Sequence, residues 1–252
     1  MDQRAIQQAA EAIVRAKRCV ALTGAGISVD SGIPDFRSPG GLWERFDPMD
    51  YAHIDSFRAS PRRVWGMLKE MRAVMTEAKP NPGHLALAEL ERLKRLQTII
   101  TQNIDNLHQD AGSGDVIEFH GNAHRFSCLR CGKIYARDQV ESGALGFPPE
   151  CACGFILKPD IVFFGEAIPT EALERSIGLA QQADMMLIVG TSATVAPANV
   201  LPTITRARGG SLIEINLERT HLGNVYGAMA LIGSSSEVLP ALVEGVRALL
   251  LQ

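Results

Sequence analysis

Residues 18–28 read RCVALTGAGIS, an apolar run that leads into two glycines separated by one residue. A continuous apolar run of this kind is typical of a strand that is buried on both faces of a parallel sheet. Glycines let the backbone approach a ligand closely, and the free N–H groups where a helix begins favour phosphate. We therefore expect a strand at 18–22 and a phosphate-binding turn at Gly24, Ala25 and Gly26.

This glycine turn is only half of a dinucleotide-binding signature. The third glycine of G-x-G-x-x-G would fall at Val29, and no acidic residue ends an obvious second strand about 20 residues further on. A tight turn in any α/β protein is therefore an alternative interpretation of this motif by itself.

Outward from the first strand, apolar runs alternate with amphipathic segments. This alternation predicts an α/β fold with a Rossmann-like parallel sheet that helices cover on both faces. Further strands are expected at 96–101, 160–164, 185–189, 211–215 and near 229–232. Helices are expected at 3–17, 62–78, 84–94, 105–111, 170–182, 198–207 and 236–250.

Composition and charge exclude several classes of protein. The 252 residues are 46% hydrophobic and 21% charged, which excludes wholesale disorder. The formal net charge of −3 provides no positive field that would attract nucleic acid or an anionic membrane surface. No apolar run approaches the roughly 18 residues of a membrane span. The N-terminal segment carries Asp2, Arg4 and Glu11 and no apolar stretch, so we expect no secretory signal.

Four of the five cysteines form two close pairs, Cys128-x2-Cys131 and Cys151-x-Cys153. Four thiolates in such pairs suit tetrahedral Zn²⁺ and leave no position for a catalytic water, so we predict a structural zinc site. Cys19 lies within the first strand and is expected in the core. Because a chain of this length needs no disulfides, we expect a reducing, cytoplasmic setting.

The segment around these cysteines predicts an inserted unit. Residues 120–158 contain short strands and turns, and we expect a small zinc-ribbon-like module within a domain formed by 1–119 and 159–252. Residues 34–61 are rich in Pro, Gly and Asp and have weak periodicity. Long irregular segments in compact domains often cover a ligand, so we expect a mobile cofactor loop there.

Polar groups follow the predicted strands at their carboxyl ends, where open parallel sheets bind ligands. Helix capping would explain one residue of such a group but not a whole cluster. Together with the glycine turn, these groups predict a nucleotide site. They are Gln102-Asn103-Ile104-Asp105, Gly190-Thr191-Ser192 and Asn216-Leu217-Glu218. His120 lies between the sheet and the cysteine module, where clefts form, and is the one histidine that we single out.

Taken together, these motifs resemble the sirtuin family over residues 20–218. The glycine turn continues as Gly24-Ala25-Gly26-Ile27-Ser28-x2-Ser31-Gly32-Ile33-Pro34-Asp35-Phe36-Arg37, which is similar to the NAD-binding signature of that family. The other matching motifs are Gln102-Asn103-Ile104-Asp105, His120-Gly121, the four cysteines and Gly190-Thr191-Ser192, in the family's order.

The resemblance implies an NAD-dependent protein-lysine deacetylase with the Rossmann-like fold already expected. In sirtuins the acyl oxygen attacks the nicotinamide ribose, nicotinamide leaves, and the acyl group ends on ADP-ribose. His120 then corresponds to the general base, and its ordinary pKa near 6.5 suits proton removal at neutral pH. Asn103 corresponds to the residue that fixes the ribose and a water, and Asp105 to the acceptor for the nicotinamide carboxamide.

The same resemblance assigns the remaining contacts with NAD. Gly24 and Ala25 would present N–H groups to the pyrophosphate, Phe36 would shield the reacting ribose, and Arg37 would hold the mobile loop. Asn216 and Glu218 fall where the adenosine ribose binds, which favours NAD over NADP. The other residues expected at the cofactor are Gly26, Ser28, Asp35, Gln102, Ile104, Gly190, Thr191, Ser192, Leu217 and Ser235.

The expected partner is an acyl-lysine protein or peptide. Val162, Phe163 and Gly165 would pair with it as an added strand, and Val195 would complete the acyl-lysine tunnel. Relatives that prefer acidic acyl groups carry a Tyr-x-x-Arg pair, and our alignment places Gly66 and Lys69 there. Without that clamp we expect acetyl or other uncharged acyl groups. We attribute the apolar Trp65, Met67 and Met71 to helix packing in preference to binding of longer acyl chains.

Two other functions remain open at this point. The first is a mono-ADP-ribosyltransferase that uses NAD, although the presence of His120, Asn103 and Asp105 does not require it. The second is a non-catalytic NAD- and zinc-binding module, since 120–158 has a mild basic bias. We expect a monomer with no specific nucleic acid or membrane partner.

Overall fold

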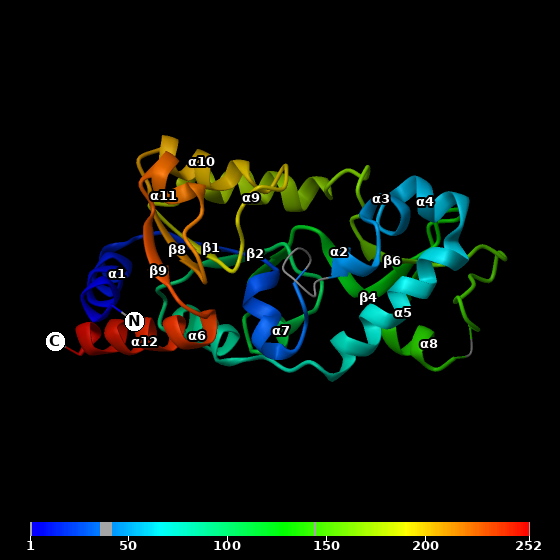
Figure 1. The fold of residues 1–252 in the computed structure, drawn as a ribbon, viewed down its shortest axis with the longest axis horizontal. Coiled ribbons are helices and arrows are strands. Elements are labelled where there is room, and N and C mark those ends of the chain that lie inside the picture. The colour runs from blue at the N-terminus through cyan, green and yellow to red at the C-terminus, as the bar shows by residue number, and fades with distance from the viewer. Residues whose placement is uncertain (1, 36–41, 144, 252) are drawn as a thin grey trace.

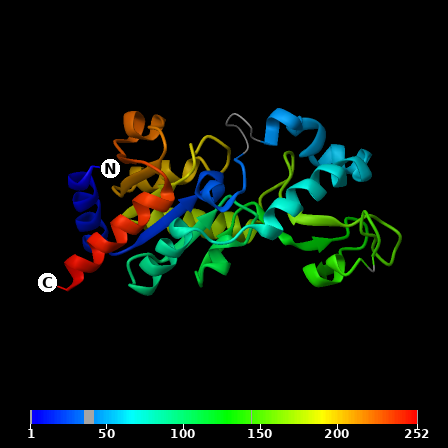
Figure 2. The same ribbon diagram turned by 60° about the horizontal axis from the view of Figure 1, so that its bottom comes forward.

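The computed structural model describes residues 2–35, 42–143 and 145–251. Two bodies lie side by side in it (Figures 1 and 2). In the described residues, the larger body contains a six-stranded parallel sheet in the order β3-β2-β1-β7-β8-β9. The strands are β1 (Cys19–Thr23), β2 (Thr98–Thr101), β3 (Val116–Glu118), β7 (Met185–Val189), β8 (Ser211–Asn216) and β9 (Met229–Ile232).

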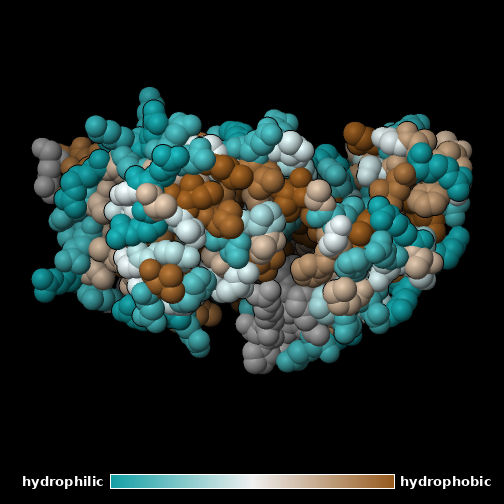
Figure 3. All heavy atoms as spheres, turned by 90° about the horizontal axis from the view of Figure 1, so that it is seen from above, coloured by the Kyte–Doolittle hydropathy of each residue, from teal (hydrophilic) through white to brown (hydrophobic). Residues whose placement is uncertain are grey.

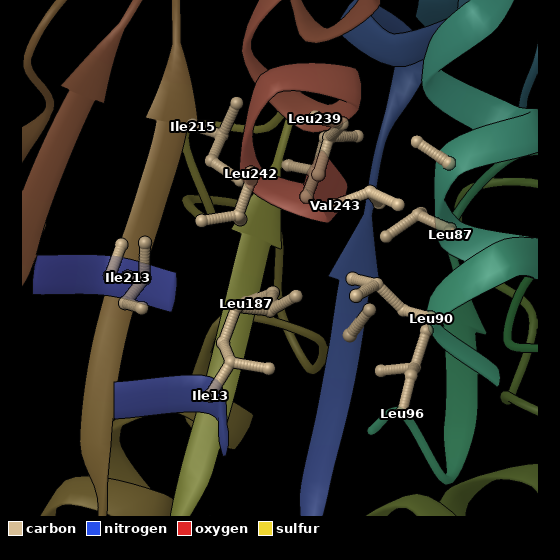
Figure 4. Close-up of a cluster of buried hydrophobic side chains, with 14 of the residues drawn as sticks. Ile13, Leu87, Leu90, Leu96, Leu187, Ile213, Ile215, Leu239, Leu242 and Val243 are labelled. Carbon is tan, nitrogen blue, oxygen red and sulfur yellow. The ribbon is translucent and has the colours of Figure 1, made fainter. Parts of the chain in front are cut away.

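Helices cover both faces of this sheet. One face packs against α1 (Gln3–Arg15), α6 (Pro82–Arg92) and α12 (Ser235–Leu250), and the other against α9 (Thr170–Gln182), α10 (Val200–Ala207) and α11 (His221–Tyr226). Alternate residues of each strand supply the two cores, because successive side chains point to opposite faces. Figure 4 shows the first core, where Leu187 and Ile213 of the sheet meet Ile13, Leu90 and Leu242 of the helices.

The strand order reverses direction between β1 and β7, which creates the position where doubly wound sheets bind ligands. Here the turn after β1 and the turn after β7 touch. A Cβ on Gly190, whose φ is +60°, would lie 2.2 Å from the Ile27 backbone nitrogen. A Cβ on Gly26 would lie 2.8 Å from the Cα of Gly190. Glycine is therefore required at both positions to bring these turns together.

The smaller body contains a three-stranded antiparallel sheet in the order β5-β4-β6. Its elements are β4 (Gly121–Ser127), β5 (Ile134–Ala136), β6 (Lys158–Ile161) and α8 (Arg137–Glu141). A separate hydrophobic core joins this sheet to α4 (Ile54–Ala59) and α5 (Pro61–Glu77), through Phe57, Trp65, Phe126 and Leu157. The Trp65 indole also donates a hydrogen bond of 2.8 Å to the Leu157 carbonyl.

This core crosses the boundary that the sequence predicted between 119 and 120. Residues of α4 and α5, which the sequence analysis assigned to the sheet domain, pack with the cysteine module. The division into 1–119 with 159–252 and 120–158 stays a prediction. Part of the segment at 34–61 is helical: α2 (Leu42–Arg45), α3 (Pro48–Tyr51) and α4, each of at most six residues.

Most predicted elements of the parallel sheet are confirmed, including the strands at 185–189 and 229–232. The strand at 160–164 is a correction, because β6 starts earlier and pairs antiparallel with β4 outside the parallel sheet. Ile161 and Phe163 are buried in the second core, so the sequence pattern alone did not distinguish the two sheets. The short edge strand β3 was missed.

Candidate active site

A cavity of about 750 Å³ lies between the two bodies. Figure 3 shows the surface hollowed there, seen from above. Its walls come from the turns after β1, β2, β7 and β8, from α5, and from the segment after β6. The carboxyl edge of the parallel sheet therefore forms one side of the cavity and the smaller body forms the other.

The structure brings most of the predicted cofactor and substrate residues together around this cavity. His120 lies on its wall, between the sheet side and the smaller body. The predicted residues that line the cavity are Gly24, Ala25, Gly26, Asp35, Gln102, Asn103, Ile104, His120, Val162, Phe163, Gly165, Gly190, Thr191, Ser192, Val195, Asn216, Leu217, Glu218 and Ser235.

Four predicted residues are not placed on the cavity wall. Phe36 and Arg37 lie outside the described residues. Ser28 and Asp105 are buried, with exposed fractions of 1% and 6%, and lie behind Asn103. For these two residues, a direct contact with a cofactor stays a prediction.

Asn103 is held from two directions by its amide nitrogen. Its Nδ2 donates to the Gly24 carbonyl at 3.2 Å and to Ser28 Oγ at 3.0 Å. Ser28 Oγ in turn donates to Asp105 Oδ2 at 2.7 Å. Both amide protons of Asn103 are thus used, so its Oδ1 remains to accept a hydrogen bond from a ligand.

Burial raises the pKa of Asp105, against the opposing effects of hydrogen bonds from the Leu107 backbone N–H and from Ser28. Two buried histidine rings lie nearby. His84 Nε2 is 3.4 Å from Ser28 Oγ, and the centroids of the His84 and His108 rings are 4.9 Å apart. Burial lowers the pKa of His84 to about 4 and that of His108 to about 3. Both rings are therefore neutral at pH 7.

His120 lies in the two-residue connection between β3 and β4, so the link between the two bodies positions it. Its Nδ1 lies 3.1 Å from the Gln102 carbonyl. A carbonyl can only accept, so Nδ1 carries the proton and Nε2 of the neutral ring is free to take one. Burial lowers the pKa of His120, while the hydrogen bond to Gln102 opposes this shift. The neutral, proton-accepting form is favoured.

At the turns after β7 and β8, the carboxyl edge of the sheet is polar, and hydrogen bonds hold its side chains in place. Asn216 Nδ2 donates to the Thr191 carbonyl at 3.1 Å and to Glu214 Oε1 at 3.0 Å. Glu214, which is fully buried, also accepts from the Thr220 backbone N–H at 2.9 Å. Gln102 Nε2 donates to Thr191 Oγ1 at 3.1 Å, which links the turns after β2 and β7.

The opposite end of the cavity is apolar. Ala52, Met67, Met71, Ile161 and Phe163 line it. Met67 and Met71 do belong to the second core, as the sequence analysis expected, but they also face the cavity. Their spacing of four residues on α5 was the available signal for this role.

The alignment of the acyl-selecting positions requires a correction. Gly66 and Lys69 are not among the lining residues. The Lys69 ammonium group lies 5.3 Å from the centroid of the Phe147 ring instead. On a helix, residues one or two positions apart face different directions, so a shift of one or two positions in the alignment exchanges which side chains reach the cavity.

The cysteine cluster is separate from the cavity. The Sγ atoms of Cys128, Cys131, Cys151 and Cys153 lie within 4.8 Å of one another, as expected for four ligands around one tetrahedral ion. The Tyr135 hydroxyl donates to Cys151 Sγ at 3.2 Å. Such a donor outside the ligand set stabilises a thiolate, so the residues fit structural zinc.

Comparison with known proteins tests the predicted family and fold. Residues 24–197 match the Sir2 family. The chain belongs to the Sir2 family. Among its relatives, the NAD-dependent protein deacylase 2 of Pyrobaculum aerophilum is 43% identical over 240 residues, which are 94% of each chain.

Solved Sir2 structures have the same fold. A Sir2 homolog–NAD complex superposes with a TM-score of 0.89 at 40% identity, covering 97% of this chain and 94% of that one. A Sir2 variant with a deacetylated p53 peptide and 3′-O-acetyl ADP ribose gives a TM-score of 0.89 at 38% identity, over 95% and 97% of the two chains. The predicted family and the fold with its four-cysteine module are confirmed.

Proposed function

We propose that this Sir2 protein removes acyl groups from lysine side chains of proteins and consumes NAD. The observation that supports this proposal is a cavity with a polar end at the sheet edge, an apolar end and His120 on its wall. NAD supplies the ribose carbon that accepts the acyl oxygen, and the products are nicotinamide, O-acyl-ADP-ribose and free lysine. The names of its relatives, NAD-dependent protein deacylase and deacetylase, agree with this activity.

His120 is proposed to act as the general base. Its Nε2 is the unprotonated nitrogen, because Nδ1 donates to the Gln102 carbonyl. A neutral imidazole in this position can remove a proton from a ribose hydroxyl. Asn103 is proposed to hold that ribose, or a water beside it, through its free Oδ1.

Asp105 has a supporting contact in addition to its predicted one. Its carboxyl group accepts from Ser28 Oγ and from the Leu107 backbone N–H, which fixes the turn that carries Asn103. We propose that Asp105 orients this turn. Its contact with the nicotinamide carboxamide stays a prediction.

The peptide is proposed to bind as an extended strand beside residues 162–165. The Phe164 backbone is already paired, since its N–H donates to the Ala52 carbonyl at 2.8 Å and its carbonyl accepts from the Ile54 N–H at 3.0 Å. The Val162 carbonyl and the Gly165 N–H have no backbone partner within the described residues. These two groups are therefore available to an added strand.

The acyl group is proposed to enter the apolar end, against Met67 and Met71. No Lys or Arg lies among the lining residues that the structure describes. An acidic acyl group would thus lose its hydration without gaining a partner charge, which favours acetyl and other uncharged chains. The thioether side chains are flexible, so longer apolar chains can also be accommodated.

Acyl selectivity can be tested with one substitution. Met71→Arg places a guanidinium beside the acyl group, so the ratio of kcat/KM for succinyl-peptide to that for acetyl-peptide is expected to rise at least about tenfold. Lys69→Arg, on the same helix but away from the cavity, is the matched control and should leave this ratio unchanged. A ratio unaffected by Met71→Arg would place the acyl group elsewhere.

The decisive experiment is mass spectrometry of an acetyl-lysine peptide incubated with the protein, with and without NAD. Loss of acetyl only with NAD, together with acetyl-ADP-ribose and nicotinamide, is expected. His120→Ala should lose this reaction, whereas the exposed His221→Ala should keep it. Consumption of NAD with an intact peptide would indicate ADP-ribosyl transfer, and intact NAD with a folded, zinc-loaded sample would indicate a binding module.

We further propose a cytoplasmic monomer. No helix in residues 2–35, 42–143 or 145–251 has the length and apolar character to cross a membrane. Four cysteines are grouped as metal ligands and Cys19 is buried, so no pair is arranged as a disulfide in the described residues. Light scattering during gel filtration measures the oligomeric state directly, and a mass near 27.3 kDa is expected.

A further inference from the structure

Lys158 is a lysine buried in the smaller body. Only 5% of the residue is exposed. Its ammonium group donates to the Ile161 carbonyl at 2.6 Å and to the Pro159 carbonyl at 3.3 Å, and it forms an ion pair of 2.9 Å with Glu166 Oε2. An ammonium has three donors, so every proton of this group has a partner. The charge is fully compensated in this one arrangement.

Glu166 connects this buried charge to the cavity. It lines the cavity, and its Oε2 also accepts a 2.8 Å hydrogen bond from the Phe163 backbone N–H. The Phe163 ring lies against the same ammonium, with its centroid 4.8 Å from Lys158 Nζ. The turn at 161–166 is therefore held from inside by one ammonium and one carboxylate.

This turn borders two parts of the active site. The Val162 N–H donates to the His120 carbonyl at 2.9 Å, and the Phe164 backbone pairs with residues 52–54. A turn without its internal partners would leave a charge buried and unpaired, which is strongly unfavourable. The position of the Val162 carbonyl and the Gly165 N–H thus depends on the ion pair.

We propose that Lys158 and Glu166 are positioning residues that hold the peptide-binding edge in its binding geometry. The inference rests on the proposed deacylase function. Neither residue needs to touch the reacting atoms, because both act through the backbone of 161–166. The pair should therefore determine affinity for the peptide and leave the NAD end of the cavity unchanged.

The test compares steady-state kinetics of Lys158→Met, Glu166→Gln and the double variant with the unmodified protein. Lys158→Met keeps the apolar stem but leaves the Glu166 carboxylate unpaired. We expect its KM for acetyl-peptide to rise at least about tenfold, while kcat and the KM for NAD change about threefold or less. The double variant should have a lower peptide KM than Lys158→Met, because the unpaired charge is removed as well.

Arg247→Met is the matched control. It breaks an ion pair with Glu89, a carboxylate that is also largely buried, but in the helical layer far from the cavity. It should lower the melting temperature without changing the peptide KM. Each variant is also checked for zinc content and for its melting temperature, so that unfolding is recognised separately.

Two results would overturn the inference. One is an unchanged peptide KM in a folded Lys158→Met. The other is an equal rise in the KM values for peptide and NAD, which is the signature of general destabilisation. If the unmodified protein itself does not deacylate the peptide, the proposed function fails instead, and the direct affinity of each variant for the acetyl-peptide, measured by calorimetry, decides the inference independently.

Discussion

At the level of single residues, the environment of His120 determines how activity depends on pH. Burial lowers the pKa of this ring, so the neutral form persists below the ordinary value near 6.5. We therefore expect the acidic limb of the kcat/KM profile to lie below pH 6.5. A pH–rate profile with its acidic limb above pH 6.5 would contradict this assignment, and a loss of about 100-fold or more in kcat is expected for His120→Ala.

Two other residues, His84 and His108, make the folded state sensitive to acid. Their pKa values of about 4 and about 3 lie below the ordinary 6.5, so the unfolded chain binds more protons between these values. Stability is therefore fully present above pH 6.5 and is lost as pH falls from 6.5 toward 4 and 3. Each ring contributes a slope of about 1.4 kcal/mol per pH unit in that window.

Urea unfolding at pH 7.5, 6.0 and 5.0 measures this effect. The double variant His84→Gln/His108→Gln should lose less free energy of unfolding between pH 7.5 and pH 5.0 than the unmodified protein, although it starts from a lower stability. His221→Gln, which changes an exposed ring, should show the unmodified slope. Equal slopes in all three proteins would mean that these two rings bind protons equally in the folded and unfolded states.

Among the structural elements, the cysteine module and α5 should respond together to loss of zinc. Cys128, Cys151 and Trp65 belong to the same hydrophobic core. Chelation of zinc, or Cys128→Ser, is expected to unfold the module and expose the Trp65 indole, because ligand binding and folding of small zinc units are coupled. This exposure is measured as a red shift of the Trp65 fluorescence. The Trp43→Phe substitution removes the emission of the second tryptophan.

A milder change tests the environment of the metal ligands. Tyr135→Phe removes the donor to Cys151 Sγ and should weaken zinc binding about tenfold or more, measured by competition with a chelator. Tyr226→Phe, in α11 of the larger body, is the matched control. An unchanged zinc affinity in Tyr135→Phe would show that the hydroxyl does not support the ligand set.

Elements with a clear hydrophobic pattern were predictable from the sequence. Residues 185–189 form an uninterrupted apolar strand, and the structure has β7 within the same bounds. β6 was assigned to the wrong sheet because an apolar run says that a strand is buried, not which core buries it. The short helices α2, α3 and α4 were missed because each has too few residues to display a 3.6-residue period.

At the level of the whole molecule, the cavity could be predicted only in part. Its polar side follows from strand ends, since parallel strands bring Asn103, Thr191 and Asn216 to one edge. Its apolar side depends on how α5 sits against β6, and no local pattern specifies that packing. Met67 and Met71 were therefore attributed to helix packing in preference to the acyl site.

Both bodies line the cavity, so a bound ligand should stabilise them together. At an NAD concentration of 100 times the dissociation constant, the free energy of unfolding should rise by about 2.7 kcal/mol. Far-ultraviolet circular dichroism reports the larger body and Trp65 fluorescence the smaller one, and both unfolding curves should shift. A shift of only one curve would mean that NAD contacts one body.

The order of the elements also controls what a protease can release. Among the described elements, the chain leaves the larger body between Ser31 and α2, returns between α5 and α6, leaves again between β3 and β4, and returns between β6 and α9. Each body is thus made of discontinuous segments. A cut at any one of these connections leaves the other three intact, so a singly nicked molecule should still elute from gel filtration as one particle. Neither body can be obtained by shortening the gene from one end.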